Sequence, residues 1–215
     1  AKLGAGNAGQ GALEYRLQYT ADDNTSSVVT SAWGAYYYMI DQANRVLARI
    51  DEIPSASPAD DAVKTRYKGE AMAMRAIGHY ELLRNYSGNY DANALGVPVM
   101  TSNQTFAFPP RNTMGEVMQQ IETDLTTAKT MVATASSSNY SDTAINNIVV
   151  AGLQARVALY KGDFDAAITY ATEVINSGIR PLDGGNFPLI WTDQSQAELL
   201  FRYRFATSTI IGGLF

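Results

Sequence analysis

The sequence predicts a mainly all-α fold of stacked helix pairs, with one short β element near the C-terminus. Three observations lead to this prediction. Apolar residues recur at steps of three and four through most of residues 33–178, which is the period of an amphipathic helix. Residues that favour helix N-termini stand before several of these segments. Near the end of the chain the period changes to two, which is typical of a strand.

Two long helical segments are predicted in the first half of the chain. One face of the first segment consists of residues three or four apart: Trp33, Tyr37, Ile40, Asn44, Leu47 and Ile50. Before the second segment, Ser57 can cap the N-terminus and Pro58 fits the first turn. Asp60 and Asp61 favour the positive end of its dipole. One face of this helix carries a narrow stripe of mostly small residues, which lets another helix approach closely. The stripe contains Val63, Tyr67, Ala71, Met74, Gly78 and Leu82. Gly88 is expected to end this helix.

Three more helices are predicted after residue 112. Thr113 and Glu116 have the spacing of a capping box, which marks the start of the third helix. Its buried face is expected to contain Val117, Ile121, Leu125 and Ala128. Asp142 is expected to cap a fourth helix that runs to about Tyr160. Gly162 then allows a turn into a fifth helix, whose inward face is expected to contain Phe164, Ala167, Ile168, Ala171 and Val174.

The last two predicted helices have the features of a tetratricopeptide hairpin, because alanines lie where the two helices need close packing: Ala155, Ala158 and Ala167. Helix pairs of this kind cannot bury their faces alone and must stack. The connections between the earlier pairs are longer, so the repeat is irregular. Residues 33–178 are therefore expected to form a tetratricopeptide-like helical domain, which follows an irregular N-terminal segment of residues 1–32.

Residues 179–215 are expected to form an irregular and β segment, and to be the start of a second part of the protein. The expected strand rests on Phe201, Tyr203 and Phe205, which alternate with Arg202 and Arg204.

Composition excludes several classes of function. The net charge of −5 and the lack of any basic run argue against nucleic-acid binding, which needs clustered Lys and Arg. Cysteine is absent, which excludes disulfides, thiolate catalysis and cysteine metal sites. No apolar stretch approaches the ~20 residues of a membrane-spanning helix. Gly4, Gly6 and Gly9 have the spacing of a dinucleotide loop, but no predicted strand leads into them.

Four motifs occur in order between residues 37 and 117. The first is an aromatic-x-x-Ile-x-x-Ala-Asn helix formed by Tyr37, Ile40, Ala43 and Asn44. The second is an Arg-Ala helix that contains Arg75, Ala76, Leu82 and Arg84. It leads into the third, the segment "YDANALGVP" of residues 90–98. The fourth is a helix start with Arg111, Thr113, Glu116 and Val117. Together these motifs resemble the SusD/RagB family of Bacteroidetes.

The resemblance implies a surface-exposed glycan-binding lipoprotein of the outer membrane. A member of this family holds a polysaccharide or oligosaccharide and delivers it to a TonB-dependent, SusC-like transporter, without catalysis and without a cofactor. Family members carry their lipid anchor on a cysteine that is not in this chain, and they have a second half that the resemblance does not cover. The segment of residues 85–103 is expected to be mostly structural, because it joins two helix pairs in this family.

The ionisable residues do not form a recognisable catalytic or metal site. His79 is the only histidine, and no G-x-S-x-G or H-E-x-x-H motif is present, so His79 is expected to be a packed or hydrogen-bonded helix residue. Paired acids such as Asp22 with Asp23, or Asp60 with Asp61, are better explained as caps than as the two carboxyls of a glycosidase. No catalytic residue and no metal ligand are predicted.

Sugar binding needs flat aromatic rings for the C–H faces of the sugar and polar side chains for its hydroxyls. Three loop clusters offer both. The preferred cluster contains Tyr19, Asp22, Asp23, Asn24 and Trp33. A further candidate contains Asn186, Phe187 and Trp191. The remaining cluster, with Tyr86, Asn89 and Tyr90, is part of the family pattern and is better explained as a capped turn whose aromatic residues pack inward. The same structural explanation stays open for the other two clusters.

Two other functions remain as alternatives. A tetratricopeptide-type adaptor would bind a peptide or protein partner in a concave groove, and it predicts regular repeats of about 34 residues. The uneven spacing of the helix pairs weighs against it. A glycoside hydrolase predicts turnover of the bound sugar.

Overall fold

The computed structural model describes residues 27–104, 108–138, 140–192 and 194–203. Over these residues the chain forms six α-helices and one 3-10 turn: α2 (Ser27–Arg49), η1 (Ile50–Glu52), α3 (Pro58–Tyr86), α4 (Met114–Met131), α5 (Asn147–Lys161), α6 (Phe164–Ser177) and α7 (Phe187–Ile190). The described ranges contain no strand, only two isolated bridges that connect Leu95 with Thr113 and Ala133 with Asn146. The prediction of an all-α fold is confirmed.

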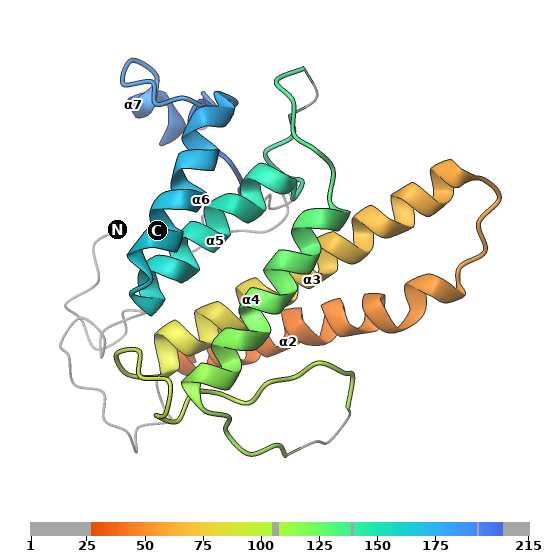
Figure 1. Cartoon of the computed structure of the whole chain (residues 1–215), viewed down its shortest axis with the longest axis vertical. Coiled ribbons are helices and arrows are strands. Elements are labelled where there is room, and N and C mark those ends of the chain that lie inside the picture. The colour runs from red at the N-terminus through yellow and green to blue at the C-terminus, as the bar shows by residue number, and fades with distance from the viewer. Residues whose placement is uncertain (1–26, 105–107, 139, 193, 204–215) are drawn as a thin grey trace.

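From α2 to α6, successive helices pack against one another in the order of the chain (Figure 1). α2 and α3 form a hairpin whose tip, at η1, extends beyond the other helices. α4 packs along α3, α5 contacts α4, and α6 pairs with α5. The long connection between α3 and α4 runs below these helices in the view of Figure 1. None of the described helices is both long and apolar enough to cross a membrane.

Two of the predicted helix starts are present with their caps. The Ser57 hydroxyl accepts a hydrogen bond from the Asp60 amide at 3.3 Å, and Pro58 occupies the first turn of α3. At the start of α4, the Thr113 hydroxyl accepts from the Glu116 amide at 3.2 Å, and the Glu116 carboxylate accepts from the Thr113 amide at 2.9 Å. This is the predicted capping box.

The close approach of α2 and α3 depends on glycine at one point. A Cβ atom at Gly78 would lie 2.6 Å from Cγ1 of Ile40, which is far inside van der Waals contact. The close approach predicted from the narrow stripe of α3 is therefore confirmed at Gly78. Farther toward the tip of the hairpin, Val63 and Tyr67 are exposed, because α3 there extends past α4.

The prediction that Asp142 caps the fourth helix was wrong. Asn146 caps α5, because its Oδ1 accepts hydrogen bonds from the amides of Ile148 and Val149, both at 3.0 Å. Asp142 instead binds Arg202: the two side chains form an ion pair of 2.6 Å, and the Arg202 amide donates to the Asp142 carbonyl at 2.8 Å. Asp142 thus fastens the C-terminal segment to the region before α5.

The predicted strand is also wrong where the structure describes it. Residues 199–203 have no strand conformation, and Arg204 and Phe205 lie outside the described ranges. The alternation of aromatic and arginine residues has another cause. Phe201 packs against the core, and the next residue, Arg202, pairs with Asp142. A strand also needs a neighbouring strand for its backbone hydrogen bonds, and the described part of the chain offers none.

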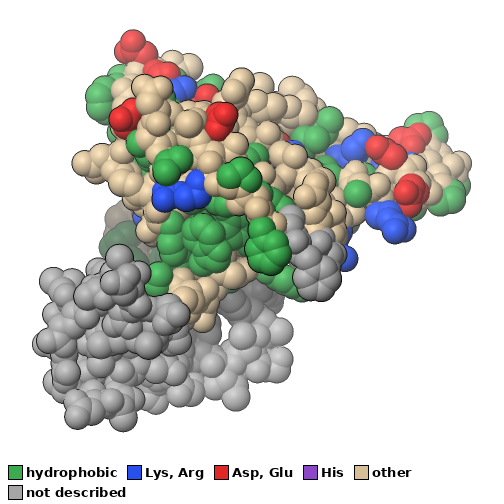
Figure 2. Space-filling view, turned by 90° about the horizontal axis from the view of Figure 1, so that it is seen from below, with side chains coloured by type: hydrophobic (Ala, Val, Ile, Leu, Met, Phe, Trp, Pro, Cys, Tyr) green, Lys and Arg blue, Asp and Glu red, His purple; other side chains and the backbone are tan. Residues whose placement is uncertain are grey.

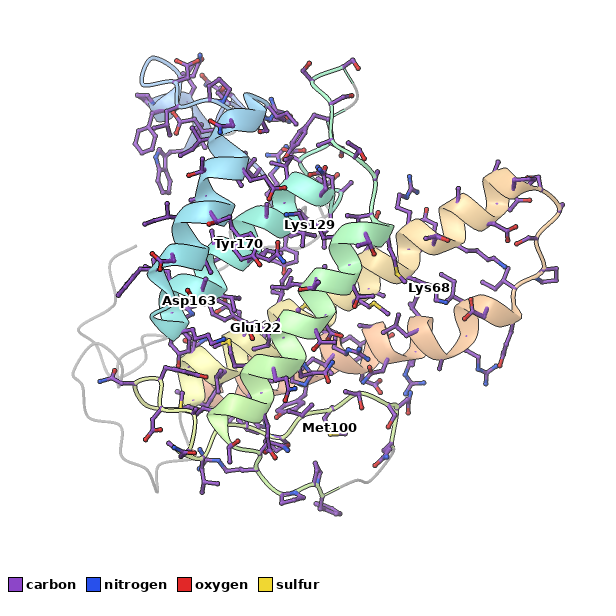
Figure 3. The ribbon with its side chains drawn as sticks, viewed as in Figure 1. Lys68, Met100, Glu122, Lys129, Asp163 and Tyr170 are labelled. Carbon is purple, nitrogen blue, oxygen red and sulfur yellow. The ribbon has the colours of Figure 1, made fainter. Side chains whose placement is uncertain are left out.

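The predicted inward face of α6 was wrong at two positions. Phe164 and Ile168 are each 64% exposed, whereas Ala167, Ala171 and Val174 are half-buried. Within the described residues α6 lies at the end of the stack and packs on α5 through its small residues, so its larger apolar side chains have no helix to cover them. Tyr170 lies toward α4, where Nζ of Lys129 is 5.4 Å from its ring centroid (Figure 3).

Candidate ligand-binding groove

A groove of about 720 Å³ lies between α2 and the connection from α3 to α4. The connection lies at the bottom of Figure 1, and Figure 2 shows hydrophobic side chains gathered near the centre of the face seen from below. The α2 side of the groove is lined by Trp33, Gly34, Tyr37, Tyr38, Ile40, Asp41, Asn44 and Arg45. The other side is lined by Pro98, Met100, Ser102, Asn103, Gln104, Phe108 and Pro109.

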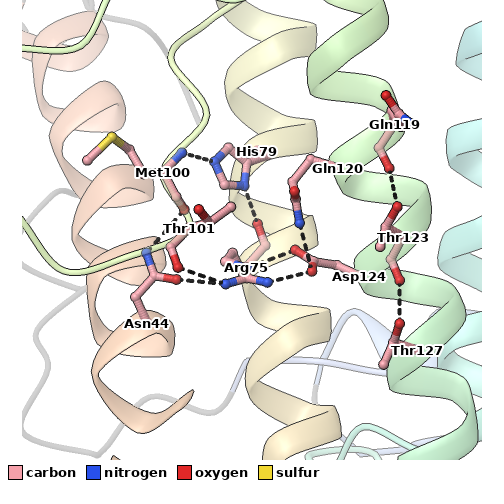
Figure 4. Close-up of polar contacts among 10 residues, drawn as sticks. All are labelled: Asn44, Arg75, His79, Met100, Thr101, Gln119, Gln120, Thr123, Asp124 and Thr127. Atoms are coloured by element: carbon pink, nitrogen blue, oxygen red, sulfur yellow. Dashed lines mark hydrogen bonds and ion pairs between the residues drawn. The ribbon is translucent and has the colours of Figure 1, made fainter. Parts of the chain in front are cut away.

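The second wall is irregular backbone, so its position depends on contacts with the helices. The most extensive of these contacts is a buried polar network centred on Arg75 of α3 (Figure 4). The Arg75 guanidinium forms a bidentate pair with Asp124 of α4, with Nε–Oδ2 at 2.8 Å and Nη2–Oδ1 at 2.6 Å. Its Nη1 donates to Oδ1 of Asn44 at 2.9 Å and to the Thr101 carbonyl at 3.3 Å. One guanidinium thus connects both walls of the groove to the core.

His79 of α3 binds the backbone of the same wall. The Met100 amide donates to Nε2 of His79 at 3.0 Å, so Nε2 is unprotonated and the ring proton is on Nδ1. Nδ1 in turn donates to the Arg75 carbonyl at 3.0 Å. Burial lowers the pKa of His79 to about 4, and the ring is therefore neutral at physiological pH. The prediction of a packed, hydrogen-bonded helix histidine is confirmed.

Two side chains of α2 bind the backbone of the wall directly. Nδ2 of Asn44 donates to the Met100 carbonyl at 3.1 Å. The Tyr37 hydroxyl donates to the Pro98 carbonyl at 2.9 Å, and burial raises the pKa of this phenol above its usual range. The Tyr37 hydroxyl and the Asn44 amide nitrogen are therefore engaged with the backbone of the wall. Tyr37 presents only its ring to the groove.

Aromatic rings form the apolar part of the lining. Trp33 is half-buried, with its ring centroid 4.9 Å from that of Tyr37 and 4.9 Å from that of Tyr86. These two neighbours fix the orientation of the indole. Tyr38 and Phe108 stand more freely, with 67% and 94% of their surface exposed. A partly fixed ring beside exposed rings is suited to the apolar face of a flat, ring-shaped ligand.

Polar groups lie along the edge of the groove. Ser102, Asn103 and Gln104 supply hydroxyl and amide groups, and Nε2 of Gln104 donates to Oγ of Ser102 at 3.2 Å. Asp41 and Arg45 form an ion pair on the α2 side, with Nε–Oδ2 at 2.8 Å. These are the donor and acceptor groups that sugar hydroxyls need, next to a surface on which a sugar ring can stack.

A second groove, of about 690 Å³, lies on the other side of the hairpin between α2 and α3. Its lining is mostly aliphatic and includes Met39, Val46, Ile50, Ile53 and Met74. It offers far fewer hydroxyl and amide groups than the first groove. A hydroxyl-rich ligand therefore fits the first groove better, because its polar groups would lose hydrogen bonds to water without replacement in the second.

The structure separates the predicted site residues. Trp33 lines the groove, whereas Tyr19, Asp22, Asp23 and Asn24 lie outside the described residues.

The remaining two predicted site residues, Asn186 and Trp191, lie at α7, near the top of Figure 1. The connection that forms one wall of the groove lies at the bottom of that view. Asn186 closes a turn with Asp183, and Trp191 is 78% exposed beside Phe187, with ring centroids 6.1 Å apart. The described residues of this cluster do not meet those of the groove.

In the cluster that was explained as structural, Tyr86 and Tyr90 do pack against other rings. Tyr86 contacts Trp33, and the ring centroid of Tyr90 lies 6.2 Å from that of Tyr160.

Sequence reasoning missed several lining residues. On α2 these are Tyr38, Asp41 and Arg45, whose spacing of three and four residues marks a second stripe beside the buried one. That spacing was a usable signal. On the connection they are Ser102, Asn103, Gln104 and Phe108, which show no period that could place them.

The described residues contain no group of three or more acidic or histidine side chains that could hold a metal ion. His79, the one histidine of the chain, has both ring nitrogens engaged with backbone groups. The lining of the groove supplies aromatic rings for stacking and polar groups for hydrogen bonds.

Comparison with known proteins gives the family. Residues 7–159 match the family model described as SusD-like, starch-binding associating with outer membrane. This match covers more than half of the 215 residues, and the chain belongs to the SusD-like family. A SusD-like protein of Formosa agariphila is 29% identical over 156 residues, which are 71% of this chain and 27% of that protein.

Solved structures have the same fold. A SusD superfamily protein from Bacteroides thetaiotaomicron is 28% identical with a TM-score of 0.78, over 92% of this chain and 43% of that one. A SusD-like carbohydrate binding protein from Bacteroides vulgatus is 25% identical with a TM-score of 0.67, over 81% and 37% of the two chains. A laminarin binding SusD-like protein is 25% identical with a TM-score of 0.62, over 75% and 34%.

The chain spans less than half the length of each of these relatives. Within that span it has the all-α SusD-like fold, and SusD-like binding proteins are non-catalytic. The family description also indicates association with the outer membrane.

Proposed function

We propose that this chain binds a polysaccharide or oligosaccharide in the groove between α2 and the connection from α3 to α4. The observation that carries the proposal is the lining itself, in which the rings of Trp33, Tyr38 and Phe108 adjoin the hydroxyl and amide groups of residues 102–104. One relative of the same fold is described as laminarin binding, which makes β-glucan oligosaccharides a suitable first probe.

In the cell, the proposed role is nutrient capture at the outer membrane. The bound glycan would pass to a TonB-dependent, SusC-like transporter on which the protein sits as a surface-exposed lipoprotein. The family description supports the membrane association, and the rigid helix stack suits a docking scaffold. Copurification of the full-length protein with such a transporter from outer membranes tests this part; purification without any barrel protein contradicts it.

The groove is tested by isothermal titration with a panel of oligosaccharides. We expect Trp33→Ala to weaken binding about tenfold, because it removes the stacking surface, while the helical circular dichroism stays unchanged. Trp191→Ala is the matched control, since Trp191 is exposed at α7 and does not line the groove. Equal affinity in the wild type and Trp33→Ala would contradict the assignment of the groove.

Two further results would change the functional class. Release of new reducing ends from the bound sugar would make the protein a glycoside hydrolase. Binding of peptides and of no sugar would make it a tetratricopeptide-type adaptor.

A further inference from the structure

The charged groups of the groove bear on which sugars it accepts. Among the described residues that line it, only Asp41 and Arg45 carry a charge. They lie four residues apart on α2, with the acid on the N-terminal side, which is the favourable order for an ion pair on a helix. Nε of Arg45 is 2.8 Å from Oδ2 of Asp41. The lining therefore has no net charge.

Other cations near the groove also bind other groups of the protein. Arg75 on α3 lies behind the wall, where Asp124 binds its guanidinium in a bidentate pair. Arg49, one turn farther along α2, is within 3.6 Å of Glu52. Arg111, on the connection, donates to the backbone carbonyls of Leu95 and Gly96 and does not line the groove.

A glycan that carries carboxylate or sulfate groups needs an available cation, for which a bidentate arginine is the best donor. In this groove the anion would have to compete with Asp41 for Arg45. Even after Arg45 had turned to the ligand, the carboxylate of Asp41 would remain close by and repel it. A neutral sugar meets no such obstacle, because Ser102, Asn103 and Gln104 can bind its hydroxyls.

We infer that the groove selects uncharged glycans over uronic-acid or sulfated glycans, and that Asp41 is the residue that sets this selectivity. This inference rests on the proposed function, because it names the class of glycan for the same groove. Asp41 acts by occupying Arg45 and by opposing a second negative charge at the edge of the groove.

The test compares a neutral β-glucan hexasaccharide with an oligouronate hexasaccharide by isothermal titration at low ionic strength. The wild type should bind the neutral sugar at least about tenfold more tightly, with an affinity that does not depend on salt. In Asp41→Asn, the side chain keeps its shape but loses its charge. We expect this variant to bind the oligouronate about fivefold more tightly than the wild type does, the size of one exposed ion-pair interaction. The readout is the ratio of the two affinities, because Asp41 itself lies at the edge of the groove. The preference for the neutral sugar should fall about fivefold.

Asp61→Asn is the matched control. Asp61 is an exposed acid near the start of α3 that also has a basic neighbour, with Lys64 Nζ at 3.7 Å, but it does not line the groove. This variant should bind both sugars as the wild type does. Oligouronate binding by the wild type as tight as that of the neutral sugar would overturn the selectivity and leave the proposed function standing. An unchanged oligouronate affinity in Asp41→Asn would overturn the role of Asp41. Binding of neither sugar would overturn the proposed function itself.

Discussion

Arg75 and Asp124 form a bidentate ion pair that joins α3 to α4 in the interior of the helix stack (Figure 4). Their side chains retain only 10% and 3% of their exposure. The remaining N–H groups of Arg75 reach Asn44 and the Thr101 carbonyl, and Nε2 of Gln120 donates to Asp124 at 3.0 Å. The pair is thus the centre of a network that connects three helices and one wall of the groove.

Removing one partner of this pair should be costly. In Asp124→Ala the Arg75 charge stays buried without its counter-ion, and we expect the free energy of unfolding to fall by about 3–5 kcal/mol. Urea denaturation followed by circular dichroism measures the loss. Asp51→Ala is the control, because Asp51 binds Lys68 at 2.7 Å in an exposed pair that is worth less than about 1 kcal/mol. Similar losses in the two variants would mean that the buried network does not stabilise the fold as described.

The buried His79 predicts a specific dependence of stability on pH. Its pKa is about 4 in the folded protein and 6.5 in an unfolded chain. Between these values the unfolded state binds a proton that the folded state does not, so stability decreases as the pH falls from about 6.5 to 4. Below about pH 4 both states are protonated and this residue causes no further loss. The total effect is on the order of 3 kcal/mol.

His79→Gln separates this effect from that of the carboxylates, because glutamine does not titrate. The measurement is the free energy of unfolding from urea titrations across the interval from pH 7 to pH 4. We expect the variant to be less stable than the wild type at pH 7 but to lose less stability on acidification. Parallel pH profiles of the two proteins would show that His79 does not resist protonation in the fold.

The contact between α2 and α3 at Gly78 leaves no room for a larger side chain. The Cβ of Gly78→Ala would stand 2.6 Å from Cγ1 of Ile40, so the helices must separate, and we expect a loss of about 1–3 kcal/mol in the free energy of unfolding. Gly34→Ala is the matched control within a helix, since no described atom beyond the neighbouring helix backbone lies within 4 Å of the added methyl group. That variant should gain about 0.5–1 kcal/mol, because alanine favours the helix. Thermal and urea unfolding of both variants give the comparison, and a stabilised Gly78→Ala would contradict the close packing.

The helices were predictable where their signals are local. The caps of α3 and α4 depend on residues three positions apart, Ser57 with Asp60 and Thr113 with Glu116, and both were read from the sequence. The start of α5 shows where such signals stop being sufficient. Asp142 and Asn146 are both good capping residues, and the contact with Arg202, 60 residues farther along the chain, takes Asp142 away from the helix.

Of the two walls of the groove, only the one on α2 had a signal in the sequence. Trp33 was identified as a site residue because it is the aromatic end of a polar cluster that precedes the first family motif, and it does line the groove. The opposite wall has no period, and its position is fixed by contacts such as that of Met100 with His79, 21 residues away, and with Asn44, 56 residues away. The exposed face of α6 was mispredicted because its apolar spacing is that of a buried helix, although no described element covers it.

The wall of the groove is fastened through main-chain atoms. Its contacts with Tyr37, Asn44, Arg75 and His79 use the carbonyls of residues 98, 100 and 101 and the amide of residue 100. None of these bonds involves a side chain of residues 98–104. Val99 and Met100 also pack against the core, whereas residues 102–104 lie at the edge of the groove. Mutations can therefore exchange the side chains of residues 102–104 without breaking these bonds. Homologous proteins could in this way acquire different ligand specificities on the same backbone scaffold.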